Sequence, residues 1–150
     1  MPTDETIRTG RCLCGGVRFE TRGPVRPVIF CHCDQCRRQS GLHYAATSVA
    51  DDHLSVTGET LAWYRSSPDA RRGFCFACGT LLFWKHDGLD QTSILAGAFD
   101  QPSRLVPSHH IYTASKADFY DIGDGLEQFP ERDGRTVVGS LSVGEHDRER

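Results

Sequence analysis

The sequence lacks a long apolar run, and it also lacks an excess of basic residues. No stretch approaches the roughly 18 consecutive apolar residues of a membrane-spanning helix, so we predict no membrane contact. The net charge is −3 at pH 7, whereas proteins that bind the phosphates of nucleic acids normally carry a basic surface. We therefore expect no nucleic-acid partner.

The start of the chain lacks the basic and then apolar profile of a secretory signal peptide, because residues 1–11 are polar and mixed in charge. We therefore expect a cytoplasmic protein. Thiols stay reduced in the cytoplasm, so clustered cysteines there favour metal binding over disulfides. The cysteine count of seven agrees with this expectation, since an odd number cannot all pair within one chain.

Short apolar or alternating segments between turn residues predict a mainly β fold in a single domain. Val17, Phe19 and Thr21, for example, alternate with charged residues, which is the pattern of a half-buried strand. A short helical turn is expected only at 33–41. The other strands are expected at 24–30, 44–50, 61–65, 80–85, 93–99 and 110–113. We divide the chain into a flexible lead-in (1–9), a zinc domain (10–130) and a polar C-terminal tail (131–150).

The cysteines fall in three tight clusters, Cys12-x-Cys14, Cys31-x-Cys33-x2-Cys36 and Cys75-x2-Cys78. Such short spacings place thiolates within reach of one metal ion, most often zinc. The seven cysteines divide naturally into four and three. Four thiolates close a tetrahedral structural site, whereas three leave a fourth position open, as in catalytic zinc sites.

The first and last clusters together predict a structural zinc site. Cys12 and Cys14 point to one face if their segment is extended, and Cys75 and Cys78, followed by Gly79, have the form of a zinc knuckle. A shared ion would tie the start of the domain to its middle. The alternatives are two separate half-sites or buried free cysteines.

The middle cluster predicts a catalytic zinc site. Cys31 and Cys33 share a face if the segment is extended, and Cys36 returns to them if the chain then bends into a helix. Three thiolates and one Zn²⁺ sum to a charge of about −1, which suits the binding of an external thiol as thiolate. The alternative is a second structural zinc, with His32, Asp34 or a distant histidine as fourth ligand.

Several other charged residues are weaker candidates. Arg37 and Arg38 follow the middle cluster and are candidates to bind the carboxylates of a substrate, although both can equally be surface charges. Weaker candidates for the same role are Lys116 and Arg72. The alternative candidates to offset the charge of the four-cysteine site are Arg11, Arg18 and Arg72. His110 is a candidate proton shuttle or a structural histidine. The remaining histidines without a pattern are interpreted as surface residues: His43, His53, His86 and His146.

Five blocks of the sequence resemble the glutathione-dependent formaldehyde-activating enzyme family, which also occurs as a domain in centromere protein V. The similarity runs from about residue 10 to 130 and uses every cysteine. The blocks contain Cys12-x-Cys14-Gly15-Gly16, Cys31-His32-Cys33-x2-Cys36-Arg37, Cys75-x2-Cys78-Gly79, His110-Ile111-Tyr112 and Asp124-Gly125-Leu126.

The resemblance implies a β-tent-like zinc fold of short antiparallel strands and two zinc ions per chain. The structural ion would bind Cys12, Cys14, Cys75 and Cys78, and the catalytic ion would bind Cys31, Cys33 and Cys36. The implied reaction is of carbon–sulfur lyase type and joins glutathione to formaldehyde or a related small aldehyde. Arg37 would bind the glutathione. The alternative function is a non-catalytic, zinc-stabilised binding module of the same fold.

Overall fold

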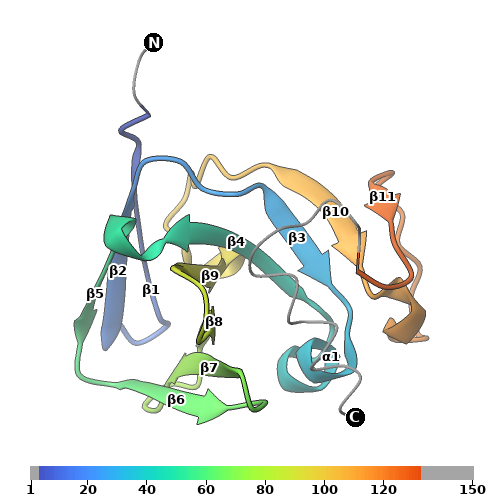
Figure 1. Cartoon of the computed structure of the whole chain (residues 1–150), viewed down its shortest axis with the longest axis horizontal. Helices are drawn as coiled ribbons and strands as arrows, with labels where there is room; N and C mark the ends of the chain where they lie inside the picture. Colours follow the sequence, from blue (N-terminus) through green and yellow to red (C-terminus); the bar gives the residue numbers. More distant parts are fainter. Residues whose placement is uncertain (1–3, 133–150) are drawn as a thin grey trace.

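A computed structural model describes residues 4–132, and Figure 1 shows its two sheets. The smaller sheet is antiparallel and has the strand order β1-β2-β5. Its strands are β1 (Ile7–Arg11), β2 (Val17–Arg22) and β5 (Leu54–Gly58). This sheet forms the left side of the molecule in Figure 1.

The larger sheet has eight strands in the order β11-β10-β3-β4-β9-β8-β7-β6. Its strands are β3 (Val28–Cys31), β4 (Tyr44–Ala50), β6 (Leu61–Arg65), β7 (Ala70–Cys75), β8 (Leu81–His86), β9 (Gln91–Leu95), β10 (Pro107–Ile111) and β11 (Glu127–Gln128). Short 3₁₀ helices occupy Asp51–His53, Ala96–Ala98 and Thr113–Ser115. The prediction of a mainly β domain is confirmed.

The one α-helix of residues 4–132, α1 (Asp34–Ser40), lies where the helical turn was predicted. It begins directly after the metal loop because the Cys33 sulfur caps it, accepting a hydrogen bond from the backbone N–H of Cys36. It ends at Gly41, whose φ of 90° is readily adopted only by glycine and whose N–H donates to the Arg37 carbonyl. Figure 1 shows α1 beside the end of β3.

Several predictions about the strands were wrong in detail. The strand expected at 24–30 begins only at Val28, and the segment 93–99 leaves the strand after Leu95. The lead-in is not loose throughout, because β1 begins at Ile7. The strands are also not all antiparallel, since β10 runs parallel to both β3 and β11. Parallel pairing needs a long connection, and the chain from β4 to β9 supplies it between β3 and β10.

Two buried clusters form the core. One surrounds Cys12 and Cys75 with Val17, Phe19 and Phe83, and the other contains the three middle cysteines. Both candidate metal groups therefore lie inside the packed structure. The predicted tail lies outside the described residues apart from Glu131 and Arg132. Within residues 4–132, no helix has the length and apolar character required to cross a membrane.

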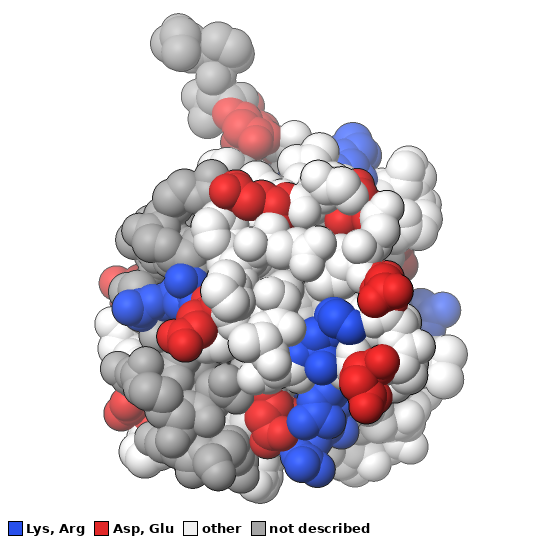
Figure 2. Space-filling view, turned by 90° about the vertical axis from the view of Figure 1, so that its right-hand side faces the viewer, with Lys and Arg blue, Asp and Glu red and all other residues white. Residues whose placement is uncertain are grey.

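On the face drawn in Figure 2, basic side chains lie beside acidic ones. Their charges do not merge into a broad basic surface among the described residues visible there.

Candidate metal centre and active site

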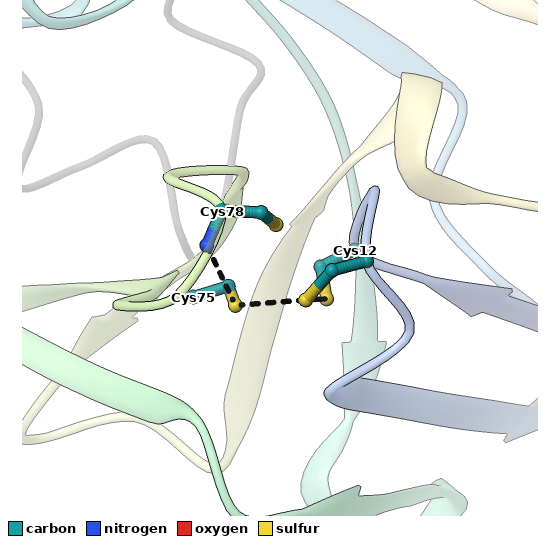
Figure 3. A group of neighbouring side chains, drawn as sticks. Cys12, Cys75 and Cys78 are labelled. Carbon is teal, nitrogen blue, oxygen red and sulfur yellow. Dashed lines mark hydrogen bonds between the residues drawn. The ribbon is translucent and has the colours of Figure 1, made fainter.

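The first and last cysteine clusters meet in space. Figure 3 shows the sulfurs of Cys12, Cys75 and Cys78 facing one another from two turns, one between β1 and β2 and the other between β7 and β8. Cys14 lies 3.7 Å from both Cys12 and Cys75, measured between sulfur atoms. All four sulfurs are within 4.8 Å of one another. The two pairs therefore form one group.

The spacing of these sulfurs fits zinc. A Zn–S bond of about 2.3 Å in a tetrahedron requires sulfurs roughly 3.8 Å apart, and the two measured distances are 3.7 Å. The surroundings shift the pKa values of these thiols in both directions, and the neighbouring thiols raise the pKa of Cys14 to about 11. The N–H of Val17 donates to the Cys12 sulfur, and the Thr80 hydroxyl beside Cys78 lowers the pKa of that thiol to about 5. This group can hold a metal ion, as the sequence predicted.

The glycines beside these cysteines have a geometric role. Gly15 and Gly79 both have a φ of 81°, in the left-handed region that side chains disfavour. Gly79 also closes the turn by donating its N–H to the Cys75 carbonyl at 2.7 Å. The Cys-x-x-Cys-Gly pattern therefore builds the tight turn that brings two sulfurs to one side.

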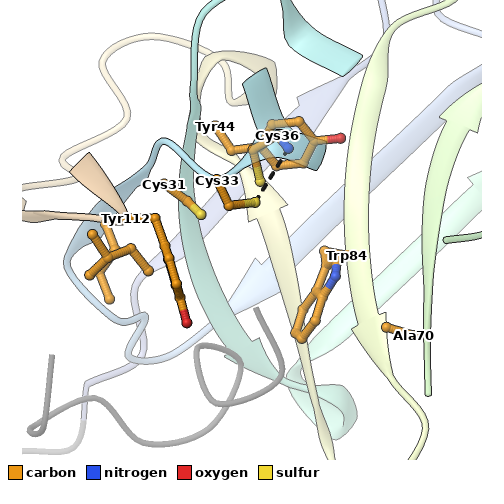
Figure 4. Close-up of a cluster of buried hydrophobic side chains, with 9 residues drawn as sticks. Cys31, Cys33, Cys36, Tyr44, Ala70, Trp84 and Tyr112 are labelled. Carbon is orange, nitrogen blue, oxygen red and sulfur yellow. Dashed lines mark hydrogen bonds between the residues drawn. The ribbon is translucent and has the colours of Figure 1, made fainter. Parts of the chain in front are cut away.

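The middle cluster forms a second group. Cys31 ends β3, Cys33 caps α1 and Cys36 lies in its first turn, and Figure 4 shows the three sulfurs converging. They lie within 4.8 Å of one another, and all three residues are buried. Within residues 4–132, no histidine or carboxylate belongs to this group. The described chain therefore offers three ligands and leaves a fourth position without one.

Asp34 and His32 were predicted as alternative fourth ligands, but in the structure both side chains form hydrogen bonds with other residues. Asp34 accepts hydrogen bonds from Arg37 at 2.8 Å and from Arg38 at 2.9 Å. His32 lies on the other face of the sheet, where its Nε2 is 2.8 Å from the Nδ1 of His110. These contacts favour an open fourth position over a closed structural site.

Arg72 lies at the three-cysteine group, so of the three alternatives Arg11, Arg18 and Arg72 it is not the one that flanks the four-cysteine group. It is only 2% exposed, and its Nη1 donates to the Cys36 sulfur at 3.6 Å. Strand alternation explains the placement, because Arg71 points to the opposite face of β7 and covers Trp63. Burial alone would raise the pKa of Cys36. The Cys31 and Cys33 thiols and the Arg72 guanidinium nevertheless hold that pKa well below its usual value.

A small cavity of about 40 Å³ opens beside the three-cysteine group. One water occupies roughly 10–15 Å³ on this measure, so the cavity holds only a few small atoms. Its lining combines two metal-ligand candidates with two cations and two aromatic rings: Cys31, Cys36, Arg26, Arg72, Tyr44 and Trp84. We call this space the metal-side cavity.

A larger cavity of about 240 Å³ lies over α1 and shares Arg72 with the metal-side cavity. We call it the α1 cavity. Arg38 lines it, whereas Arg37 lines neither of these two cavities. The Arg37 guanidinium donates to Asp34 and to the Ser115 carbonyl at 3.2 Å. Of the two candidate arginines, only Arg38 therefore lines one of these two cavities.

A chain of hydrogen bonds, buried between His32 and His110 and partly exposed at its ends, crosses the face of the sheet opposite the sulfurs. Asp124 Oδ2 lies 2.8 Å from His110 Nε2, and His110 Nδ1 lies 2.8 Å from His32. The Tyr120 hydroxyl is 3.3 Å from His32 and 3.4 Å from His43. Because an ionised Asp124 accepts from His110, the chain also fixes which ring nitrogens carry protons.

The interpretation of His43 as a surface residue was wrong. The ring is half-buried and packs against Phe30. Burial, followed by the charge of His110, lowers the pKa of His43. For His32 burial is also the largest cause, and its pKa falls to about 4. Sequence reasoning missed this network because its members are far apart in the chain and follow no local pattern.

The chain is similar to known proteins in both sequence and fold. A family model described as glutathione-dependent formaldehyde-activating enzyme matches residues 7–115. An uncharacterised lyase from Schizosaccharomyces pombe is 26% identical over 121 residues, covering 80% of this chain and 88% of the relative. The crystal structure of a Rhodobacter sphaeroides protein has a TM-score of 0.51 at 19% identity, covering 81% of this chain and 98% of that one. This last likeness supports the fold alone.

Proposed function

The chain belongs to the glutathione-dependent formaldehyde-activating enzyme family, and from this membership we propose that it joins glutathione to formaldehyde or a related small aldehyde in the cytoplasm. The reaction is of carbon–sulfur lyase type, in agreement with the name of the yeast relative. A bond forms between the thiol sulfur and the aldehyde carbon. The carbonyl oxygen becomes a hydroxyl, which takes up the proton that the thiol lost.

We propose zinc as the cofactor, with one structural and one catalytic ion. Cys12, Cys14, Cys75 and Cys78 would hold the structural ion, and Cys31, Cys33 and Cys36 the catalytic one. A bound Zn²⁺ would supply acidity, so that a thiol in the fourth position exists as thiolate near neutral pH. The observation that carries the proposal is the group of three buried cysteines with an open position beside a small cavity.

Charge supports a thiol as the fourth partner. Four thiolates on one Zn²⁺ sum to about −2, and the metal-side cavity carries two cations, Arg26 and Arg72. The bound thiolate would therefore find its charge balanced. An uncharged aldehyde keeps that balance, and the small volume of the cavity restricts it to one or a few carbons.

The chain's own residues would then hold and orient the reactants. Arg72 keeps the Cys36 sulfur in place through its guanidinium. Tyr44 and Trp84 are buried walls of the metal-side cavity and would keep water away from the bound reactants. Exclusion of water strengthens the attraction between the thiolate and the nearby guanidinium groups.

The experiment is exchange spectroscopy with ¹³C-formaldehyde and glutathione, since the adduct also forms without an enzyme. We expect the zinc-loaded protein to accelerate exchange between free formaldehyde and the adduct, and Cys36→Ser to lose at least about tenfold of that acceleration. Arg22→Gln is the control, because Arg22 is an exposed residue of β2. A wild-type rate equal to that in buffer, with both metals bound, would support the binding-module alternative instead.

A further inference from the structure

We propose that the α1 cavity binds the peptide part of the thiol substrate, with Arg38 pairing with one of its carboxylates. This inference rests on the proposed function and adds the place where the body of a tripeptide thiol docks. The residues of the α1 cavity that carry the argument are Asp34, Gln35, Arg38, Tyr64, Ser66 and Arg72.

The position of the cavity fits a substrate that reaches the metal group with its sulfur. The metal-side cavity is too small for a tripeptide, and the α1 cavity adjoins it through Arg72. One guanidinium nitrogen of Arg72 donates to the Cys36 sulfur, and another donates to Gln35 Oε1 at 3.0 Å. Arg72 therefore connects the three-cysteine group to the lining of the α1 cavity.

The charge of the cavity fits a peptide with an excess of carboxylate. Its ionised side chains are Asp34, Arg38 and Arg72. The charge of Arg72 faces the Cys36 sulfur, so Asp34 and Arg38 balance each other, and the excess positive charge comes from Arg37. The Arg37 side chain does not line the cavity, but its guanidinium donates a hydrogen bond to the Asp34 carboxylate. Glutathione carries one more carboxylate than ammonium groups, so it complements this lining. The Arg38 side chain is 71% exposed and can reorient toward a ligand.

Two residues of the cavity lining also carry buried polar atoms that lack partners. Among the residues that the structure describes, Ser66 Oγ and Arg72 Nε are buried and make no hydrogen bond. Buried polar groups are normally paired, so such atoms need an explanation. Peptide carbonyl and N–H groups of a bound ligand would supply partners once these side chains turn toward the cavity. Tyr64, which is 57% exposed, adds an aromatic surface on which the ligand's methylene groups can lie.

The experiment uses S-methylglutathione as the probe, because its blocked sulfur cannot enter the metal site as a thiolate. Its affinity for the zinc-loaded protein is measured by titration calorimetry. We expect Arg38→Gln and Ser66→Ala each to weaken binding, by roughly tenfold for the arginine, which makes the charge-assisted contact. Arg22→Gln is the matched control and should bind as the wild type does. The structure gives Arg22 an ion pair with Glu20 on β2.

A second measurement separates this subsite from the chemistry. Turnover of formaldehyde with 2-mercaptoethanol, which has no peptide part, should be the same in Arg38→Gln and in the wild type. The proposal is overturned if the wild type does not bind S-methylglutathione, or if Arg38→Gln and Ser66→Ala bind it as tightly as the wild type. Retained turnover of 2-mercaptoethanol would then leave the proposed function standing. Loss of turnover with every thiol, despite Arg38-dependent binding of the probe, would overturn the function and not the subsite.

Discussion

Replacement of Arg72 by methionine tests how the three-cysteine group is held. The substitution keeps much of the side chain's apolar volume and removes the guanidinium. It deletes hydrogen bonds to the Cys36 sulfur at 3.6 Å, to Gln35 at 3.0 Å and to Gln39 at 3.2 Å. It also removes the cation from the face of the Tyr44 ring, 4.9 Å away.

The expected cost is large because Arg72 is almost fully buried. Removing one partner of a buried, hydrogen-bonded charge pair costs about 3–5 kcal/mol. That is a substantial part of the roughly 5–15 kcal/mol that stabilises a domain of this kind. Loss of a group that supports a metal ligand also lowers metal affinity by about 10–100-fold. We therefore expect the Arg72→Met variant to fold weakly and to lose the metal of the three-cysteine group first.

Arg71→Met provides the matched control on the same strand. Arg71 lies over Trp63, 4.4 Å from the ring centre, and its loss should cost less than about 1 kcal/mol. Native mass spectrometry counts the retained zinc ions, and competition with a chromophoric chelator gives their affinities. If Arg72→Met retained both ions as firmly as Arg71→Met does, the reasoning about the guanidinium–sulfur contact would be refuted.

Three further outcomes are expected. Cys78→Ala should abolish cooperative folding in circular dichroism, because a structural zinc contributes on the order of 10–16 kcal/mol; a well-folded variant would contradict the four-cysteine site. Asp124→Ala should lower the melting temperature by a few degrees, since it leaves the buried His110 N–H without its acceptor; unchanged melting would argue against the chain of hydrogen bonds. Side-chain NMR should show His32 titrating at about pH 4 rather than near 6.5. Between these values the unfolded chain binds a proton that the folded chain excludes, so lowering the pH through this window lowers the free energy of unfolding.

The cysteine spacing was sufficient to predict both metal groups. Each pair of cysteines lies on a turn or helix start whose geometry follows from short-range rules, such as the positive φ of Gly79. The alternation of Val17, Phe19 and Thr21 likewise predicted β2, where these three residues are buried. Local sequence therefore determines the parts of the site that are built locally.

The environment of the three-cysteine group could not be predicted in this way. The strand β7 was not predicted because two adjacent charged residues, Arg71 and Arg72, interrupt the apolar pattern of a strand. Arg72 can be buried because its guanidinium donates hydrogen bonds to Cys36 and Gln35. The His32–His110 contact joins residues 78 positions apart. Such pairings depend on the tertiary fold, and no local pattern in the sequence indicates them.

The central claim is that the three-cysteine group binds zinc and accepts a thiol in its fourth position. X-ray absorption at the zinc edge, on protein with its zinc content measured, tests this claim most directly. We predict two zinc ions per chain and a gain of one sulfur ligand at one of them when glutathione is added. One ion per chain, or two ions whose spectra do not change with glutathione, would contradict the account.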